Sequence, residues 1–189
     1  MAEKVKARIM DANKIRRVLA RMATEAIEAN RNLKNLAIVG VKTRGVTIGR
    51  RLARLIKELE GVDVPVTSLD ITRYRDDIPA PQANGALRAA AIGIPIVKKD
   101  VLLVDDVVMT GRTVRAAMDA LVDRGRPKSI QLAVLIDRGH RELPIRPDYA
   151  GKTLPTSRRE VVRVRLKEED GVDEVLIAEP VKVDGGGKR

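Results

Sequence analysis

The chain has 189 residues, 44% of them hydrophobic and 33% charged, which is typical of one globular domain and not of a disordered or fibrous chain. It contains no cysteine and a single histidine, which excludes disulfides, thiol nucleophiles and metal sites made of cysteine or of several histidines. Its net charge of +11 favours a phosphate-bearing partner, while the presence of only two tyrosines and no other aromatic residue argues against modules that stack bases on aromatic platforms.

The N-terminal third is the basic end of the chain. Residues 1–60 carry 15 Lys and Arg against 6 Asp and Glu, which favours phosphate-bearing partners, although a basic surface also serves solubility alone. Residues 1–10 lack the apolar core of a secretion signal, and no apolar run in the chain approaches the roughly 20 residues of a membrane helix. We therefore expect a cytoplasmic protein with no membrane partner.

The first predicted elements form a helix and then a strand–helix–strand unit. Residues 11–30 carry apolar side chains at helical spacing, with Asp11 placed as the N-cap. The continuous apolar run Leu36–Val41 predicts a strand buried on both faces. A second amphipathic helix ends at Gly61, and Val64–Ile71 predicts the next strand.

The middle of the chain alternates again between strand and helix after an irregular segment. Residues 76–95 contain three prolines and no sustained period, which predicts a long mobile flap loop. Val101–Val104 predicts a strand, Val114–Val122 a helix and Ile130–Ile136 another strand. This order predicts an α/β fold with a doubly wound, mostly parallel sheet and helices on both faces.

The C-terminal part follows a different pattern. Apolar residues alternate over 162–166 and again over 174–178, on either side of a turn at 168–171. This pattern predicts an antiparallel hairpin on one edge of the sheet. Residues 181–189 are rich in glycine and are expected to fray, so residues 1–189 are predicted to form a single domain.

The segment most informative about function is Val101–Thr113, in which a buried strand leads into two adjacent carboxylates, Asp105 and Asp106. Ligands of open α/β sheets bind beyond the carboxyl ends of the strands, where these carboxylates suit a cis-diol or a hydrated Mg²⁺. Thr110–Thr113 then opens a helix, whose free N–H groups and hydroxyls favour a phosphate. Together they predict a ribose 5-phosphate site, although the carboxylates alone could simply cap the turn.

Val101–Thr113 resembles the phosphoribosyl-pyrophosphate (PRPP) motif of type I phosphoribosyltransferases. Four further segments carry a narrower resemblance: 39–45, 69–77, 111–121 and 134–149. They resemble the family of bifunctional pyrimidine-operon attenuators and uracil phosphoribosyltransferases. The resemblance implies the type I fold with a small hood, and Mg²⁺-dependent formation of UMP and pyrophosphate from uracil and PRPP. It also implies UMP-responsive binding to pyr mRNA, and a homodimer or homotetramer.

The resemblance also implies roles for particular residues. Asp105 and Asp106 would hold the ribose hydroxyls and Mg²⁺, the metal either directly or through water, and act with Arg44 in catalysis. The 5-phosphate loop would consist of Val107, Val108, Met109, Thr110, Gly111, Arg112 and Thr113. Met109 stands where the family commonly has an aromatic residue.

Pyrophosphate would be bound by Lys42, Thr43 and Arg44, with Arg88 closing over it from the flap. The residues themselves agree, since positive charge at a second strand end, next to a helix N-terminus, suits a leaving group that gains negative charge. A lone basic turn of this kind is equally consistent with a solvated surface.

Recognition of the nucleobase or of UMP would fall to Arg138, His140 and Val162. A solitary histidine is more often a structural hydrogen-bonding group than a catalyst, and contact with the pyrimidine is the role we expect for His140. No residue is a convincing general base for the N1 proton of uracil.

RNA binding is less strongly implied than catalysis. The attenuators carry longer or more polar groups at the positions of Ala20, Thr24 and Ala29, all on the first predicted helix. Two alternatives therefore stay open beside the uracil transferase. One is an RNA-binding nucleotide sensor with little or no turnover, and the other is a type I transferase for another base.

Overall fold

A computed structural model describes residues 3–74 and 93–180 of the chain. The flap predicted at 76–95 therefore lies almost entirely outside the described residues, as do Arg88 and the tail 181–189. Within the described part, the elements follow in this order: β1 (Glu3–Met10), α1 (Ala12–Ala29), the 3-10 turn η1 (Leu33–Asn35), β2 (Leu36–Val41), α2 (Arg44–Glu60), β3 (Val66–Leu69), the 3-10 turn η2 (Thr72–Tyr74), β4 (Asp100–Val108), α3 (Arg112–Val122), β5 (Ser129–Asp137), β6 (Tyr149–Thr153), β7 (Val161–Arg165), α4 (Lys167–Asp170) and β8 (Glu174–Pro180).

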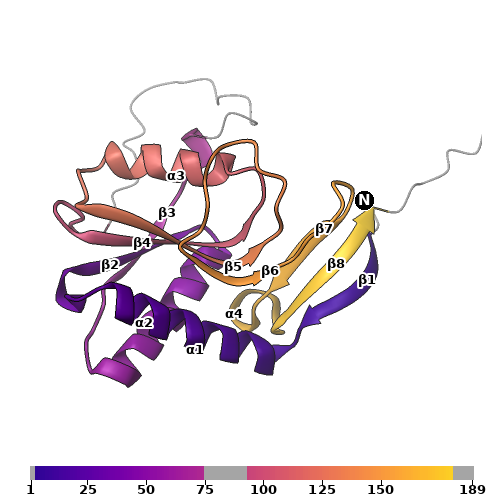
Figure 1. Cartoon of the computed structure of the whole chain (residues 1–189), viewed down its shortest axis with the longest axis horizontal. Helices are drawn as coiled ribbons and strands as arrows, with labels where there is room; N and C mark the ends of the chain where they lie inside the picture. The colour runs from indigo at the N-terminus through magenta and orange to yellow at the C-terminus, as the bar shows by residue number, and fades with distance from the viewer. Residues whose placement is uncertain (1–2, 75–92, 181–189) are drawn as a thin grey trace, which may run out of the picture.

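The main sheet has five parallel strands in the order β3-β2-β4-β5-β6. Helices α1 and α2 cover one face and α3 covers the other (Figure 1). Each face has its own apolar cluster, built almost entirely from aliphatic side chains because the chain has so few aromatic residues. The predicted doubly wound sheet with helices on both faces is confirmed.

Several predicted element boundaries are confirmed. Helix α1 begins after Asp11, whose Oδ1 accepts the Lys14 N–H at 2.8 Å, as an N-cap does. Helix α2 ends at Gly61, which adopts φ 69°, a left-handed conformation that glycine takes without strain. The strand expected at Val64–Ile71 is shorter and spans only Val66–Leu69, the residues that pair with β2.

Strand β4 is longer than the predicted Val101–Val104. It continues to Val108 because β5 still pairs with it there, with Asp105 opposite Val134 and Val108 opposite Asp137. The expectation that Asp105 and Asp106 follow the strand is therefore wrong, since both lie within its C-terminal half. The backbone of Asp105 is still paired with β5, and both carboxylates lie near the carboxyl end of β4.

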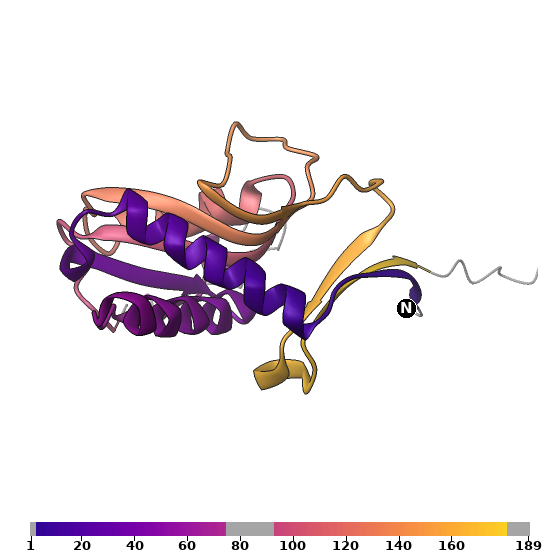
Figure 2. The same cartoon turned by 60° about the horizontal axis from the view of Figure 1, so that its bottom comes forward.

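The C-terminal hairpin is confirmed, but its place in the fold differs from the prediction. Strands β7 and β8 pair antiparallel, and β8 also pairs with β1, so the three strands form a separate sheet in the order β1-β8-β7. Figure 2 shows this sheet extending from one end of the main body. The sequence indicated no partner for the hairpin, because β1 is mostly exposed and lies more than 150 residues away in the chain.

Strand β6 is a further element that the sequence did not predict. Its five residues include Gly151 at a position where a Cβ atom would lie 2.5 Å from Leu135 O, so a larger residue would not fit there. Among the described residues, no helix combines the length and apolar character needed to cross a membrane.

Candidate functional site

A cavity of about 480 Å³ lies at the carboxyl ends of β2, β3 and β4. In the sheet order, the chain passes from β2 to β3 on one side and then from β4 to β5 on the other, so the direction of winding reverses between β2 and β4. Open α/β sheets bind ligands at such a switch point. The cavity is lined by Val41, Lys42, Thr43, Asp70, Ile71, Thr72, Asp105, Asp106, Val107 and Thr113.

Two glycines allow the start of α2 to approach the sheet closely enough to form this cavity. A Cβ atom on Gly45 would lie 2.4 Å from Val104 O, and one on Gly40 would lie 2.4 Å from the Cα of Val46. Both distances are too short for any side chain, so the loop after β2 can lie against β4 only with glycine at these positions. The sequence feature K-T-R-G thus brings the basic loop next to the acidic pair.

The acidic pair is fixed by its own backbone. Asp105 is buried and its Oδ1 accepts the Asp106 N–H at 2.9 Å, while Oδ1 of the half-buried Asp106 accepts the Val107 N–H at 2.8 Å. Burial raises the pKa of Asp106, and the charge of Arg44 acts in the opposite direction. The carboxylates therefore bind neighbouring backbone N–H groups, as expected if they cap the turn. They also line the cavity.

The two carboxylates at the cavity fit a magnesium ion whose other ligands come from water and from a substrate. Asp105 and Asp106 are the two acidic residues that β4 contributes to the cavity wall, and no cluster of three metal-ligating side chains occurs in the part of the chain that the structure describes. Mg²⁺ is commonly held by one or two carboxylates, with water and phosphate oxygens completing its shell.

The predicted phosphate loop lies at the N-terminus of α3. Gly111 is the N-cap with φ 92°, and Thr110 Oγ1 accepts the Arg112 N–H at 3.3 Å. Thr113 lines the cavity, whereas the Arg112 side chain pairs with Glu142 at 2.8 Å (Nε to Oε2). Of the three residues before Thr110, Val107 lines the cavity and Val108 is packed in the core below it.

Met109 takes part in the contacts of the phosphate loop through its backbone carbonyl. Its carbonyl accepts a hydrogen bond from Arg141 Nη1 at 2.8 Å. Arg141 also forms an ion pair with Asp137, 2.8 Å between Nη2 and Oδ2, and donates to Ile145 O. This arginine, which we did not predict, ties the segment after β5 to the phosphate loop.

Of the residues predicted for pyrophosphate, Lys42 and Thr43 line the cavity, whereas Arg44 is not among its lining residues. The Lys42–Thr43 peptide is cis, and Lys42 Nζ lies 3.4 Å from Asp70 Oδ2. Arg44 points to the turn at α4, where Nε and Nη2 donate to the two carboxylate oxygens of Asp170 at 3.2 and 2.7 Å. These hydrogen bonds raise the pKa of Arg44, so its charge is permanent.

The α4 turn is clamped to α2 by more than Arg44. Thr47 donates to Glu169 at 2.9 Å, and Arg51 pairs with both Glu168 and Asp173. Residues 44, 47 and 51 share one face of α2 because they are one and two helical turns apart. The second sheet is thereby connected to the start of α2.

The residues predicted at the nucleobase lie after β5 and are already hydrogen-bonded. Arg138 is buried, with 7% of its surface exposed, and its guanidinium contacts the segment 156–160. His140 Nε2 lies 2.6 Å from Thr156 O, and since a carbonyl only accepts, that nitrogen carries a proton. Val162 is buried in the apolar cluster, and none of these three residues is among those that line the cavity.

The structure adds Asp70 and Thr72 to the cavity wall and Asp170 as the partner of Arg44. Asp70 Oδ1 accepts from the backbone N–H and hydroxyl of Thr72, and both residues line the cavity. The strand-end rule that singled out Asp105 would also have found Asp70, which directly follows β3. Asp170 carries no such signal, because its contact with Arg44 spans 126 residues.

The chain matches a known protein family over most of its length. The model of the phosphoribosyl transferase domain matches residues 7–169. The chain is similar to the Bifunctional protein PyrR of Thermoanaerobacter sp. (strain X514), with 54% identity over 93% of this chain and 99% of that protein. It is also similar to the Bifunctional protein PyrR of Deinococcus radiodurans, with 55% identity over 93% of this chain and 96% of that protein.

Solved structures share the fold at low sequence identity. A hypoxanthine-guanine phosphoribosyltransferase of Bacillus anthracis superposes with a TM-score of 0.70 at 15% identity, covering 95% of this chain and 100% of that one. A hypoxanthine phosphoribosyltransferase of Trypanosoma cruzi gives 0.72 at 19% identity, covering 95% and 94%. The predicted type I architecture is confirmed by these structures, which say nothing about the base that this chain uses.

Proposed function

The chain belongs to the phosphoribosyltransferase family and, within it, to the bifunctional PyrR proteins, and from that premise we propose that it makes UMP and pyrophosphate from uracil and PRPP. The single observation that carries this proposal is the cavity at the switch point, where Lys42, Thr43, Asp105, Asp106 and Thr113 meet. A phosphate-binding helix N-terminus, two carboxylates and a basic loop suit the three parts of PRPP.

In this proposal, the 5-phosphate binds to the N–H groups and hydroxyls of Thr110–Thr113, and the ribose hydroxyls bind to Asp105 and Asp106. Pyrophosphate binds to Lys42, Thr43 and Arg44. Mg²⁺, when bound with PRPP at Asp105 and Asp106, supplies positive charge to the leaving group. Arg88, outside the described residues, is proposed as a further pyrophosphate ligand.

The reaction joins N1 of uracil to C1 of the ribose while the bond from C1 to pyrophosphate breaks. The bonding electrons leave with pyrophosphate, and the N1 proton is released to water. Lys42 and Arg44 stabilise the growing negative charge of the leaving group, and the cavity holds the two reactants in line. The protein therefore acts through position and charge.

A pyrophosphate-release assay over uracil, orotate, hypoxanthine, guanine and adenine tests this proposal. We expect turnover with uracil and PRPP in the presence of Mg²⁺, and little with the other four bases. Turnover with a purine instead would support the alternative of a type I transferase for another base. No turnover with any base, together with tight UMP binding, would support the nucleotide sensor.

The second candidate function is UMP-dependent binding to pyr mRNA, which the name of the PyrR relatives favours. Positions 20, 24 and 29 lie on α1, where Thr24 and Ala29 are exposed and Thr24 donates its hydroxyl to Ala20 O. With these short side chains and a basic N-terminal third, we expect RNA binding that is salt-sensitive and weakly selective.

A gel-shift titration against a pyr leader hairpin and a scrambled hairpin of equal length, with and without UMP, tests this expectation. Binding of both hairpins should fall steeply between low and physiological salt, because each neutralised phosphate releases a counterion. Tight binding of the leader alone, strengthened by UMP at physiological salt, would instead assign the full regulator function. The homodimer or homotetramer expected from the family is tested by light scattering.

A further inference from the structure

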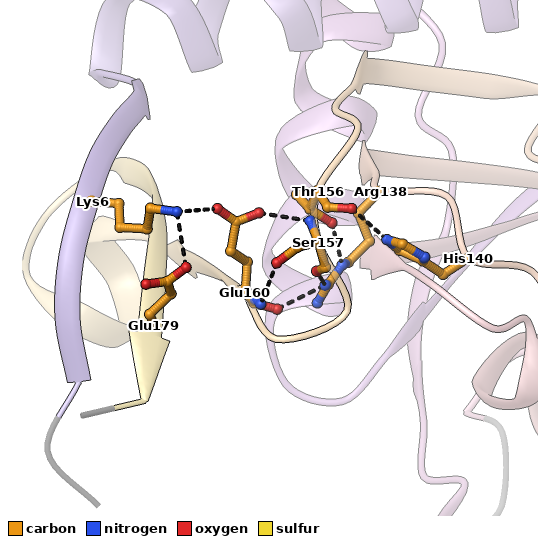
Figure 3. Close-up of polar contacts among 7 residues, drawn as sticks. All are labelled: Lys6, Arg138, His140, Thr156, Ser157, Glu160 and Glu179. Atoms are coloured by element: carbon orange, nitrogen blue, oxygen red, sulfur yellow. Dashed lines mark hydrogen bonds and ion pairs between the residues drawn. The ribbon is translucent and has the colours of Figure 1, made fainter. Parts of the chain in front are cut away.

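The segment 156–160, between β6 and β7, binds the side chains of Arg138 and His140 (Figure 3). Arg138 Nε donates to Thr156 Oγ1 at 3.1 Å, and its Nη2 donates to Ser157 O at 3.0 Å and to Glu160 O at 2.7 Å. His140 Nε2 donates to Thr156 O at 2.6 Å. The directions of Arg138 and His140 are therefore set by the oxygens of this segment.

Glu160 closes that segment into a turn. Its Oε2 accepts the Ser157 N–H at 2.7 Å, and its own backbone N–H lies 3.3 Å from both the hydroxyl and the carbonyl of Ser157. The two residues between them are exposed, so the turn is fixed by these contacts together with those from Arg138 to Ser157 O and Glu160 O. Without the carboxylate, the Ser157 N–H would lose its acceptor, and the turn would lose one of the contacts that fix its shape.

Lys6, on β1 of the three-stranded sheet, holds the side chain of Glu160 in place. Its Nζ lies 2.7 Å from Glu160 Oε1 and 2.9 Å from Glu179 Oε1, and these pairs raise the pKa of Lys6 to about 12. The Glu160 side chain is 14% exposed and that of Glu179 is 44% exposed, so solvent screens the second pair more strongly. Strand β1, through Lys6, thus supports the turn from outside.

We propose that Glu160 is a positioning residue for nucleobase recognition, which it controls by fixing the turn that holds Arg138 and His140. This inference rests on the proposed function, in which these two residues lie at the base. It assigns no direct contact between Glu160 and a ligand. The pyrophosphate side is expected to be independent of Glu160, because Lys42 and Arg44 are held by Asp70 and Asp170 instead.

Steady-state kinetics of Glu160→Ala in the full-length protein test the proposal. We expect the KM for uracil and the Kd for UMP to rise about tenfold, the loss of a hydrogen bond to a charged group, while the KM for PRPP changes less than about twofold. Glu160→Gln keeps an acceptor for the Ser157 N–H, so it should restore the KM for uracil to within about threefold of the wild type.

Glu179→Gln is the matched control, because Glu179 also binds Lys6 but lies on β8, outside the turn. It should leave both KM values unchanged. If Glu160→Ala does not fold, Lys6→Met replaces it, with an expected rise of about threefold in the KM for uracil and none in that for PRPP.

An unchanged uracil KM in Glu160→Ala, an equal rise for uracil and PRPP, or the same rise in Glu179→Gln would overturn the inference. If Lys6→Met is the variant tested, an unchanged uracil KM has the same meaning. A wild type that neither consumes uracil nor binds UMP overturns the proposed function, and this inference with it. An active wild type with an unaltered Glu160→Ala variant overturns the inference alone.

Discussion

The two ends of the predicted site are built in different ways. At the phosphate end, Lys42, Asp106 and Thr113 line a cavity of about 480 Å³, and their positions come from strand ends and a helix N-terminus. At the base end, Arg138 and His140 are held by internal hydrogen bonds to a turn. Substitutions at the phosphate end should therefore act directly on ligands, whereas those at the base end should act through positioning.

Asp106→Asn should have the largest effect and tests the direct role of the phosphate end. We expect kcat/KM to fall about 100-fold or more, because the variant loses a charge that is proposed to hold the ribose and Mg²⁺, while the melting temperature stays close to that of the wild type. Asp119→Asn, on the exposed side of α3, is the control. Full activity of Asp106→Asn would remove the acidic pair from the proposed site.

Arg44→Ala should weaken PRPP and pyrophosphate binding about tenfold and leave UMP binding nearly unchanged, because UMP lacks the pyrophosphate that this side chain is proposed to contact. Calorimetric titration of the three ligands measures the difference, with the exposed Arg50→Ala as control. Equal losses for all three would show that Arg44 acts on the fold of the loop, and the contrast between the two ends would disappear.

His140→Asn sharpens the description of the base end. His140 has φ 61°, which asparagine tolerates better than most residues, and its shorter amide takes the place of Nδ1, so the bond from Nε2 to Thr156 O is lost. A structural histidine predicts a loss of kcat of no more than about fivefold and a pH profile of unchanged shape. Loss of one limb of the pH profile would instead show that the imidazole transfers a proton.

The smallest effect concerns stability in acid. Hydrogen bonds from Arg44 lower the pKa of Asp170 below its ordinary 3.8, and those from Lys6 lower the pKa of Glu160 below its ordinary 4.5. A lowered folded-state pKa gives stability that is present above the ordinary value and is lost as the pH falls through the folded value. We therefore expect the melting temperature to fall below about pH 4 to 5.

Asp170→Asn should reduce the melting temperature at neutral pH by about 2 °C or less, because Arg44 is over one third exposed and its ion pair is screened. The variant should also show a shallower decline in acid. A decline identical to that of the wild type would show that the α4 clamp does not contribute to acid sensitivity.

The phosphate end could be predicted from the sequence because its signals are local. Continuous apolar runs, an acidic pair at the end of one run and a hydroxyl-and-glycine turn opening a helix all lie within 13 residues at 101–113. The winding rule of α/β sheets then places this segment beside the loop after Leu36–Val41, and the structure shows that arrangement.

Only the tertiary structure decided the partners that are far apart in the chain. The β1–β8 pairing, the Arg44–Asp170 contact and the Lys6–Glu160 contact join residues more than 120 positions apart. Long-range partners leave no periodic signal, since any of the 26 acidic residues could pair with any of the 37 basic ones. Local propensity determines which residues form strands and helix ends, and packing of the finished elements determines which charges meet.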